Sequence, residues 1–295
     1  MTQRQGFKPR SIALPIAVLV VAMSSFQFGA VLAKRLFPLV GAAGATALRL
    51  ALASAMMTIV WRPWRVRTSA GGARSIAIYG LAMGAMNLCF YLSLDRIPLG
   101  IAVAVEFTGP LAVAVATSRR GIDFVWIALA AAGLVALLPL VRQSRPLDPA
   151  GIELALAAGL CWALYIVFGK KAGDVHGGQT VALGTLAGAL VIVPIGIGHA
   201  GTALFSPPLL PAACGMALFS SALPYSLEMY ALTRMPTRTF GVLMSLAPAL
   251  GAISGLIFLR ESLSVMQWAA ILCIMTASAG IALTSAPTPL SALPD

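Results

Sequence analysis

Hydrophobic stretches separated by short polar breaks run through almost the whole chain. A helix needs about 20 consecutive apolar residues to cross the hydrocarbon core of a bilayer. The pattern therefore predicts an all-α membrane protein with ten transmembrane helices. The expected helices cover 12–33, 42–60, 75–94, 101–117, 124–141, 150–169, 179–198, 211–232, 238–258 and 265–284.

Composition excludes a soluble globular domain. Hydrophobic residues make up 59% of the 295 residues and charged residues only 10%, whereas soluble domains carry about 25% charged residues. The net charge of +11 is spread over short loops, without a basic patch interleaved with aromatic residues. We therefore expect contacts with membrane lipid and no nucleic-acid partner.

The distribution of lysine and arginine predicts the orientation, because positive residues concentrate on the cytoplasmic side of a membrane protein. With the N-terminus inside, thirteen lysines and arginines fall on the inner side of the predicted topology and six on the outer side. Both termini are therefore predicted to be cytoplasmic.

A weak internal repeat divides the chain into 1–146 and 147–295. Arg96-Ile97-Pro98 is followed twelve residues later by Pro110, and Arg234-Met235-Pro236 by Pro248, at a constant offset of 138. Similarly, Lys34-Arg35 recurs as Lys170-Lys171 at an offset of 136. Two units of five helices must lie in opposite orientations, because five is odd. Inverted repeats are typical of transporters, which bind their substrate near the midplane between the halves.

Four charged residues stand inside or at the edge of the apolar stretches, namely Arg49, Glu106, Glu153 and Glu228. A charge near the bilayer centre costs roughly 2.5–3.5 kcal/mol on insertion scales, so it usually marks a pathway or a pair. Glu106 precedes Pro110 by four residues, where proline kinks a helix and frees a carbonyl. Its carboxylate could hold a proton or an ammonium group. The alternative is a salt bridge with Arg49.

The other charges have structural alternatives of equal or greater weight. Arg49 is permanently charged; it could clamp a substrate carboxylate, or pair with Glu106 or with carbonyls at a helix end. For Glu228 we favour an ion pair with Arg234 or Arg238, with a gate or proton relay as the second interpretation. Glu153 complements the dipole of its first helical turn.

Uncharged polar residues add less. Gln27 and Asn87 could line a cavity or bond across helices. Trp126, Trp162 and Trp268 are interpreted as anchors at the membrane interface. The four cysteines lie in apolar segments without CxxC spacing, so we expect neither disulfides nor a metal site. Enzyme and nucleotide-binding motifs are absent from the sequence, so we expect no cofactor and no enzyme. Transport would be driven by a gradient, most simply of protons.

Several segments resemble the drug/metabolite transporter superfamily of the EamA type. They include Leu32 to Leu50, Pro98 to Ala114, Leu223 to Pro248, and the Glu-centred phrase Leu259-Arg260-Glu261-Ser262-Leu263-Ser264 with Gln267. The resemblance implies export of small amino acids such as threonine and homoserine across the bacterial inner membrane, by proton antiport through a central cavity. Glu106 and Glu228 are the acidic positions that match.

The chain departs from that pattern at two positions. Many relatives carry glutamate just before the second-repeat proline, where this chain has Ala247, whereas the first repeat has Gly109. Relatives also tend to have glycine before Glu261, where this chain has Arg260.

These observations combine into one expected mechanism. Glu106 holds the substrate ammonium group, while Arg49, or backbone N–H groups near the helix hinges Pro110 and Pro248, hold its carboxylate. The substrate hydroxyl meets polar side chains, and Glu106 and Glu228 carry the coupling proton. The polar side chains expected to contact the hydroxyl are Gln27, Asn87 and Tyr225.

Two alternatives stay open at this point. One is an exporter of broader range, for aromatic amino acids or drugs, against which the five Trp and five Tyr argue. The other is a membrane scaffold that transports nothing. The sequence favours a monomer-sized bundle and leaves a homodimer open.

Overall fold

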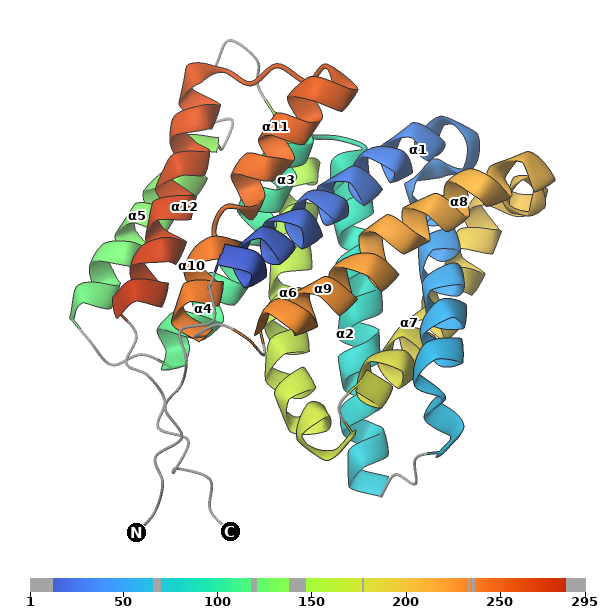
Figure 1. Cartoon of the computed structure of the whole chain (residues 1–295). Helices are drawn as coiled ribbons and strands as arrows, with labels where there is room; N and C mark the ends of the chain where they lie inside the picture. The colour runs from blue at the N-terminus through green and yellow to red at the C-terminus, as the bar shows by residue number, and fades with distance from the viewer. Residues whose placement is uncertain are drawn as a thin grey trace, which may run out of the picture.

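The computed structural model describes residues 13–65, 70–117, 121–137, 147–176, 178–232, 234 and 237–284. Every regular element within these ranges is a helix (Figure 1). In chain order they are α1 Ala13–Trp61, η1 Pro63–Arg65, α2 Ala70–Leu94, α3 Leu99–Glu106, α4 Thr108–Thr117, α5 Ile122–Leu137, α6 Pro149–His176, α7 Gly178–Ala200, η2 Gly201–Phe205, η3 Pro207–Leu209, α8 Leu210–Ala217, η4 Leu218–Ala222, α9 Leu223–Leu232, α10 Thr237–Met244, α11 Ala247–Leu259 and α12 Val265–Thr284.

The helices have the length and composition of membrane spans. In the described part of the chain, six helical segments are long and apolar enough to cross a bilayer. Two shorter apolar segments, Leu99–Val113 and Phe124–Leu137, accompany them. Large apolar side chains such as Phe124, Leu160 and Leu190 lie exposed on the outside of the bundle. Lipid is the solvent in which such a surface is stable, so the expected all-α membrane class is confirmed.

The first two expected helices run on without a loop between them. Both lie in α1, which turns at Gly41, where φ is 69° and ψ is 168°. Residues with a Cβ avoid this conformation, whereas glycine adopts it at no steric cost. The chain therefore turns between the two expected helices at Gly41, and not in a separate loop after residue 33.

Three stretches expected to be continuous helices are interrupted. The stretch 101–117 divides into α3 and α4 at Phe107, and 238–258 divides into α10 and α11 at Ser245 and Leu246. Each break comes just before a proline, which removes one helical hydrogen bond. The stretch 211–232 contains a π-helical turn, η4, between α8 and α9. Such turns widen the hydrogen-bond ladder and are frequent at functional sites.

Small residues bring the helices close together. The main packing partners are α1 with α7, α2 with α6 and α7, α5 with α12, and α3 with α11, and α1 also contacts α8, η4 and α9 (Figure 1). A Cβ on Gly100 would lie 2.4 Å from the Cα of Ala252, and one on Gly80 would lie 2.5 Å from the Gly184 carbonyl oxygen. Close approach of backbones at small residues is the usual way in which membrane helices associate.

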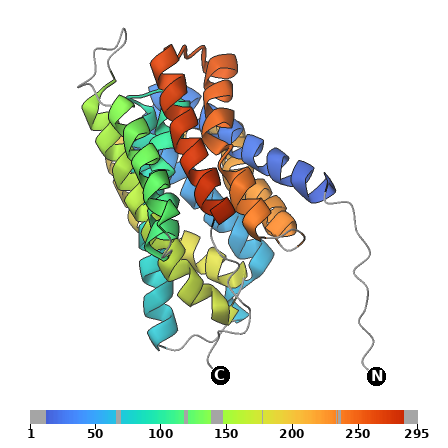
Figure 2. The same cartoon turned by 90° about the vertical axis from the view of Figure 1, so that its left-hand side faces the viewer.

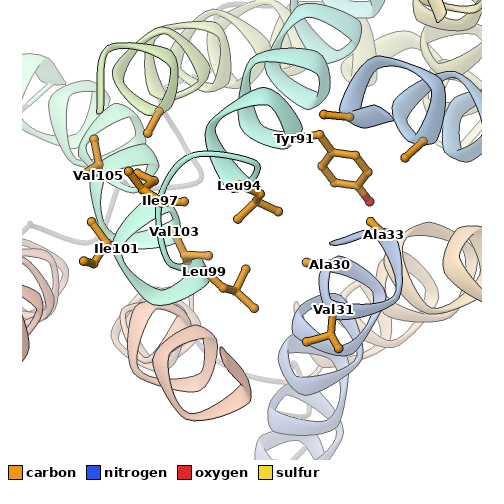
Figure 3. Close-up of a cluster of buried hydrophobic side chains, with 14 of the residues drawn as sticks. Ala30, Val31, Ala33, Tyr91, Leu94, Ile97, Leu99, Ile101, Val103 and Val105 are labelled. Atoms are coloured by element: carbon orange, nitrogen blue, oxygen red, sulfur yellow. The ribbon is translucent and has the colours of Figure 1, made fainter. Parts of the chain in front are cut away.

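Two views place these contacts in the bundle. The pair α5 and α12 forms one flank of the molecule (Figure 2). Between α1, α2 and α3 lies a fully buried apolar cluster that includes Tyr91, Leu94 and Leu99 (Figure 3). This cluster holds α3 against the rest of the bundle, and α3 carries Glu106 at its other end.

Candidate functional site

A cavity of about 250 Å³ lies inside the bundle. Seven helices contribute to its wall, from α1 near the start of the chain to α11 near its end. The side chains that line it are Met23, Phe26, Gln27, Ala30, Arg49, Met86, Asn87, Phe90, Val103, Glu106, Trp162, Tyr165, Glu228, Phe240, Met244 and Ala247. Five of the side chains singled out in the sequence thus lie around one space, namely Gln27, Arg49, Asn87, Glu106 and Glu228.

Glu106 is the last residue of α3, directly before the break at Phe107. Its side chain is 7% exposed. Pro110 has no N–H to donate to the Glu106 carbonyl, so the expected interruption at this position is confirmed. The next turn passes α6 at very close range, because a Cβ on Gly109 would lie 1.9 Å from the Gly159 carbonyl oxygen. The break therefore places the Glu106 carboxyl group at the cavity wall, next to the close crossing of α4 and α6.

Arg49 is held by neutral groups. Its Nη2 donates a hydrogen bond to the Ser220 carbonyl oxygen at 3.0 Å, in the π-helical turn η4. Its guanidinium lies 5.3 Å from the centre of the Tyr91 ring, a cation–π distance. Its Nε atom is buried and has no hydrogen-bond partner. One donor of this buried cation is thus free for a ligand.

Arg49 and Glu106 do not form a direct pair. No contact closer than 4.0 Å joins their charged groups, both of which lie in the described part of the chain, whereas Lys34–Glu261 and Arg96–Asp148 do form ion pairs. Both side chains nevertheless line the same cavity. The direct salt bridge is therefore not formed, and Arg49 instead donates to a carbonyl oxygen inside the π-helical turn η4, not to carbonyls at a helix end. A space between the two charges is what a zwitterionic ligand would need.

Glu228 lines the cavity from α9. Its Oε1 atom is buried without a hydrogen-bond partner, and Tyr165 of α6 lines the same cavity. Of the two arginines considered as partners, Arg234 is exposed and lies 3.9 Å from the Tyr230 ring centre, and the side chain of Arg238 lies outside the described residues. The position of Glu228 on the cavity wall favours the gate or relay interpretation over a surface ion pair.

The remaining expected residues differ in what they contact. Gln27 links two helices, because its Nε2 donates to the Ala247 carbonyl oxygen at 3.2 Å. Asn87 turns back on its own helix, with its Nδ2 donating to the Met83 carbonyl oxygen at 2.7 Å. Pro110 and Pro248 stand just after the two helix breaks. Tyr225 belongs to α9, but its side chain lies outside the described residues.

The cavity wall is more aromatic than the sequence suggested. Trp162 was expected to anchor the membrane interface, and that prediction is wrong. It faces the cavity and meets Phe107 edge-to-face, with ring centroids 5.5 Å apart. The other large apolar side chains of the wall were missed, since a helix that is apolar all round gives no signal for the face that borders a cavity. They are Met23, Phe26, Met86, Phe90, Tyr165, Phe240 and Met244.

No metal or disulfide chemistry is visible in the described ranges. They contain no group of three histidine, cysteine, aspartate or glutamate side chains that could hold a metal ion. Cys89, Cys161, Cys214 and Cys273 are free. What the cavity does offer is a guanidinium, two carboxyl groups and two amides within an apolar wall. That set can bind a small molecule that carries both charges, and it can exchange a proton.

An apolar helical bundle with a charged internal cavity has the construction of a membrane transporter. Residues 149–283 match the EamA-like transporter family. The threonine/homoserine exporters RhtA of Salmonella typhimurium strain LT2 and of Escherichia coli strain K12 are each 55% identical to this chain over 271 residues, which is 92% of either chain. The chain therefore belongs to the EamA-like transporter family. Proteins of this kind are transporters and not enzymes.

A solved crystal structure has the same fold. It superimposes with a TM-score of 0.62 at 19% identity, over 91% of this chain and 96% of that one. At this identity the likeness concerns the fold alone.

Proposed function

We propose that the chain forms ten membrane-spanning helices in two inverted five-helix repeats, 1–146 and 147–295. The element bounds support this arrangement. α10 begins 138 residues after α3, both are eight residues long, and the same offset relates Pro110 to Pro248. α6 begins 136 residues after α1.

The packing partners support the same arrangement. If α1 before Gly41 corresponds to α6, then α2 corresponds to α8 with α9. The contact of α1 with α8 and α9 then has its counterpart in the contact of α6 with α2. Exchange of the two halves maps the pair α5–α12 onto itself, as a two-fold axis requires. Residues of both halves line the cavity, which is what a substrate site between inverted repeats requires.

We further propose that the protein exports small amino acids, threonine and homoserine among them, across the bacterial inner membrane. The observation that carries this proposal is the spacing of opposite charges around one cavity. Arg49 offers an unpartnered Nε, and the carboxyl groups of Glu106 and Glu228 lie elsewhere on the same wall. A zwitterion can pair its carboxylate with Arg49 and its ammonium group with a glutamate carboxylate at the same time. The names of the two relatives supply the substrate class.

Protons are the proposed coupling ions, and the lysine and arginine distribution supports cytoplasmic termini. An amino acid enters from the cytoplasm with its ammonium group on Glu106 and its carboxylate on Arg49. A proton from outside neutralises the carboxyl group and releases the ammonium group. Glu228, with its unpartnered oxygen, takes up or passes on the same proton. The breaks before Pro110 and Pro248 let α3 and α10 move as separate segments while access changes sides.

The test is uptake of radiolabelled threonine and homoserine into inside-out membrane vesicles with an acidified lumen. We expect gradient-dependent accumulation that excess unlabelled homoserine suppresses. Glycerol permeability of the same vesicles serves as a control for leaks. If neither amino acid accumulates above vesicles that lack the protein, the substrate assignment is wrong.

A broader substrate range is the second candidate, and the cavity wall favours it. Phe26, Phe90, Trp162 and Phe240 add large apolar surface, which could hold a side chain bigger than that of threonine. Competition decides between the two candidates. Phenylalanine or a lipophilic cation that competes as well as homoserine would favour the broader exporter.

A further inference from the structure

A cluster of charged and backbone groups ties three segments together away from the cavity. The Lys34 Nζ atom lies 2.6 Å from Glu261 Oε1 and also donates to the Ile97 carbonyl oxygen at 3.3 Å. The Leu99 N–H donates to Glu261 Oε2 at 2.8 Å. We call Lys34, Ile97, Leu99 and Glu261 the end cluster. It joins α1, the start of α3 and the turn between α11 and α12.

Glu261 supplies the cap that α3 lacks. The N-cap residue of α3 is Pro98, whose own side chain caps no N–H group of the first turn, so N–H groups and a partial positive charge remain there for another partner. The Glu261 carboxylate accepts one of these N–H groups from a distant part of the chain. It therefore stabilises the start of the helix that carries Glu106 at its other end.

Residues at the end of α11 hold the Glu261 carboxylate in this position. Arg260 ends α11 in the left-handed conformation, with φ 57° and ψ 30°, where a helix most often has glycine. A Cβ on Gly255 would lie 2.5 Å from Glu261 Oε2, so a larger residue there would displace the carboxylate. The Glu261 N–H donates to the Gly255 carbonyl oxygen at 3.0 Å. Arg260 thus adopts a left-handed conformation that glycine usually takes at the end of a helix.

The position of the cluster relates it to the cavity. Lys34 follows the cavity residue Gln27 by seven residues on α1, and Leu99 precedes Glu106 by seven residues on α3. The end cluster therefore joins α1 and α3 about two helical turns away from the cavity residues Gln27 and Glu106. In the proposed orientation this is the outer end, while Glu228 and Tyr165 lie toward the cytoplasm.

We infer that Lys34 and Glu261 form the outer gate of the transport cycle. This inference rests on the proposed alternating access. In the conformation described here the gate is closed, and release of substrate to the outside requires the pair to separate. Separation frees the start of α3, which then swings on the break at Phe107 and carries Glu106 with it. Lys34 and Glu261 are thus positioning residues that need not touch the substrate.

The exposure of the pair fits a contact that opens and closes. The Lys34 side chain is 23% exposed and that of Glu261 is 14% exposed. Fully buried ions would be left without solvent on separation, at a large energetic cost. Ions at the edge of water are rehydrated when they part, so the closed and open states can lie close in free energy.

Thiol labelling tests the gate without reference to any substrate. Val103→Cys, in a chain whose four cysteines are replaced, places a thiol on the cavity wall. An impermeant methanethiosulfonate is added to right-side-out or to inside-out vesicles. We expect Glu261→Gln or Lys34→Met to raise the outside labelling rate at least about fivefold without raising the inside rate. Lys34→Arg is the matched control and should stay near the parent rate.

Unchanged outside labelling in both variants contradicts the gate. An equal rise from both sides, which loosening of the whole bundle would produce, contradicts it as well. Because the readout is a labelling rate, it stands even if threonine is not a substrate. A failure of the substrate assignment and a failure of the gate are therefore distinguishable.

A reversible cross-link gives a second test. In a Lys34→Cys/Glu261→Cys chain, a short bifunctional methanethiosulfonate should hold the outer end closed. We expect outside labelling of a cavity thiol to fall to background and export to stop, with recovery after reduction. The single-cysteine variants treated with the same reagent are the controls. Undiminished outside access in the cross-linked protein would overturn the proposal.

Discussion

The break between α3 and α4 and the break between α10 and α11 have the same backbone design and carry different chemistry. Each follows a helix of eight residues and precedes a proline. The first places Glu106 on the cavity wall, whereas the second places Met244 there at the equivalent position, 138 residues later. Proline determines where a helix opens, and the adjacent side chain determines what the opening can do.

The same comparison extends to the residue before each proline. Gly109 lies against the Gly159 carbonyl oxygen with no room for a methyl group, whereas Ala247 carries one at the cavity wall. The first break is therefore tightly supported by α6, and the second accepts a hydrogen bond from Gln27 at the Ala247 carbonyl oxygen. The halves differ in the chemistry they bring to the cavity and in how each break is held.

The largest effect is expected from removal of the charge at the first break. Glu106→Gln keeps the shape of the side chain but loses a charge-assisted hydrogen bond to the ammonium group, worth about 1.5–3 kcal/mol. Gradient-driven threonine transport should fall roughly 10- to 100-fold. The matched change at the second break, Met244→Leu, should leave transport within about threefold, because it conserves volume and polarity. Equal losses in the two variants would break the comparison. The measurement is initial uptake into inside-out vesicles.

Arg49 separates function from stability. Arg49→Met removes a buried cation that neutral groups hold, and replacement of buried charge by an apolar side chain of similar size is often neutral or stabilising. We expect transport to fall at least about tenfold while the unfolding temperature in detergent stays within about 3 °C. Arg49→Lys should also transport poorly, because an ammonium group lacks the planar fork of guanidinium. A large drop in unfolding temperature would assign Arg49 a structural role.

The tight support of the first break predicts a stability effect. Gly109→Ala inserts a methyl group at 1.9 Å from the Gly159 carbonyl oxygen, and overpacking of this kind costs about 1–3 kcal/mol. The unfolding temperature in detergent should fall by several degrees. Gly215→Ala is the control, since the nearest atom to its Cβ is Leu32 Cδ1 at 3.9 Å. If Gly109→Ala is as stable as the control, the crossing with α6 is looser than described.

The smallest effect is expected at the exposed Arg96–Asp148 pair, which lies outside the membrane segments. The hydrogen bond from Arg96 lowers the pKa of the Asp148 carboxyl group, with a further contribution from the Ala150 N–H. Because the pKa of Asp148 is lower in the folded state, its ionisation stabilises the folded protein at pH values above the ordinary aspartate pKa of about 3.9. This contribution is lost as the pH falls through the pKa of the folded state. Arg96→Ala should therefore lower the unfolding temperature at pH 7 by less than about 2 °C. The difference between this variant and the parent should shrink as the pH falls through the lowered pKa of Asp148. Thermal unfolding of both detergent-solubilised proteins at pH 7 and over a series of acidic pH values measures this.

Much of the helix layout was predictable from the sequence, because a bilayer demands about 20 apolar residues per crossing. The residues that break helices were also visible, since Pro110 and Pro248 lack an N–H. The glycine turn at Gly41 was not foreseen, because an apolar stretch shows no polar break there. The π-helical turn around Ser220 has no composition of its own and was likewise missed.

The site was predictable where charge marked it and hidden where it was apolar. Arg49, Glu106 and Glu228 stand out because charge is rare in such helices. Phe26, Trp162 and Phe240 look like any other apolar residue until the packing shows which face borders the cavity. Glu261 carried a recognisable motif, but its partners Lys34 and Leu99 lie far away in sequence, so only the fold could join them.

The most direct test of proton-coupled export is proton movement itself. Purified protein is reconstituted into liposomes that contain a pH-sensitive dye, and threonine is added on one side without an imposed gradient. The account predicts that threonine entry is accompanied by opposite proton movement, seen as a lumenal pH rise that Glu106→Gln abolishes and Met244→Leu retains. Threonine entry with no change in lumenal pH, or a change of the same size in Glu106→Gln, would contradict the central role of this carboxyl group.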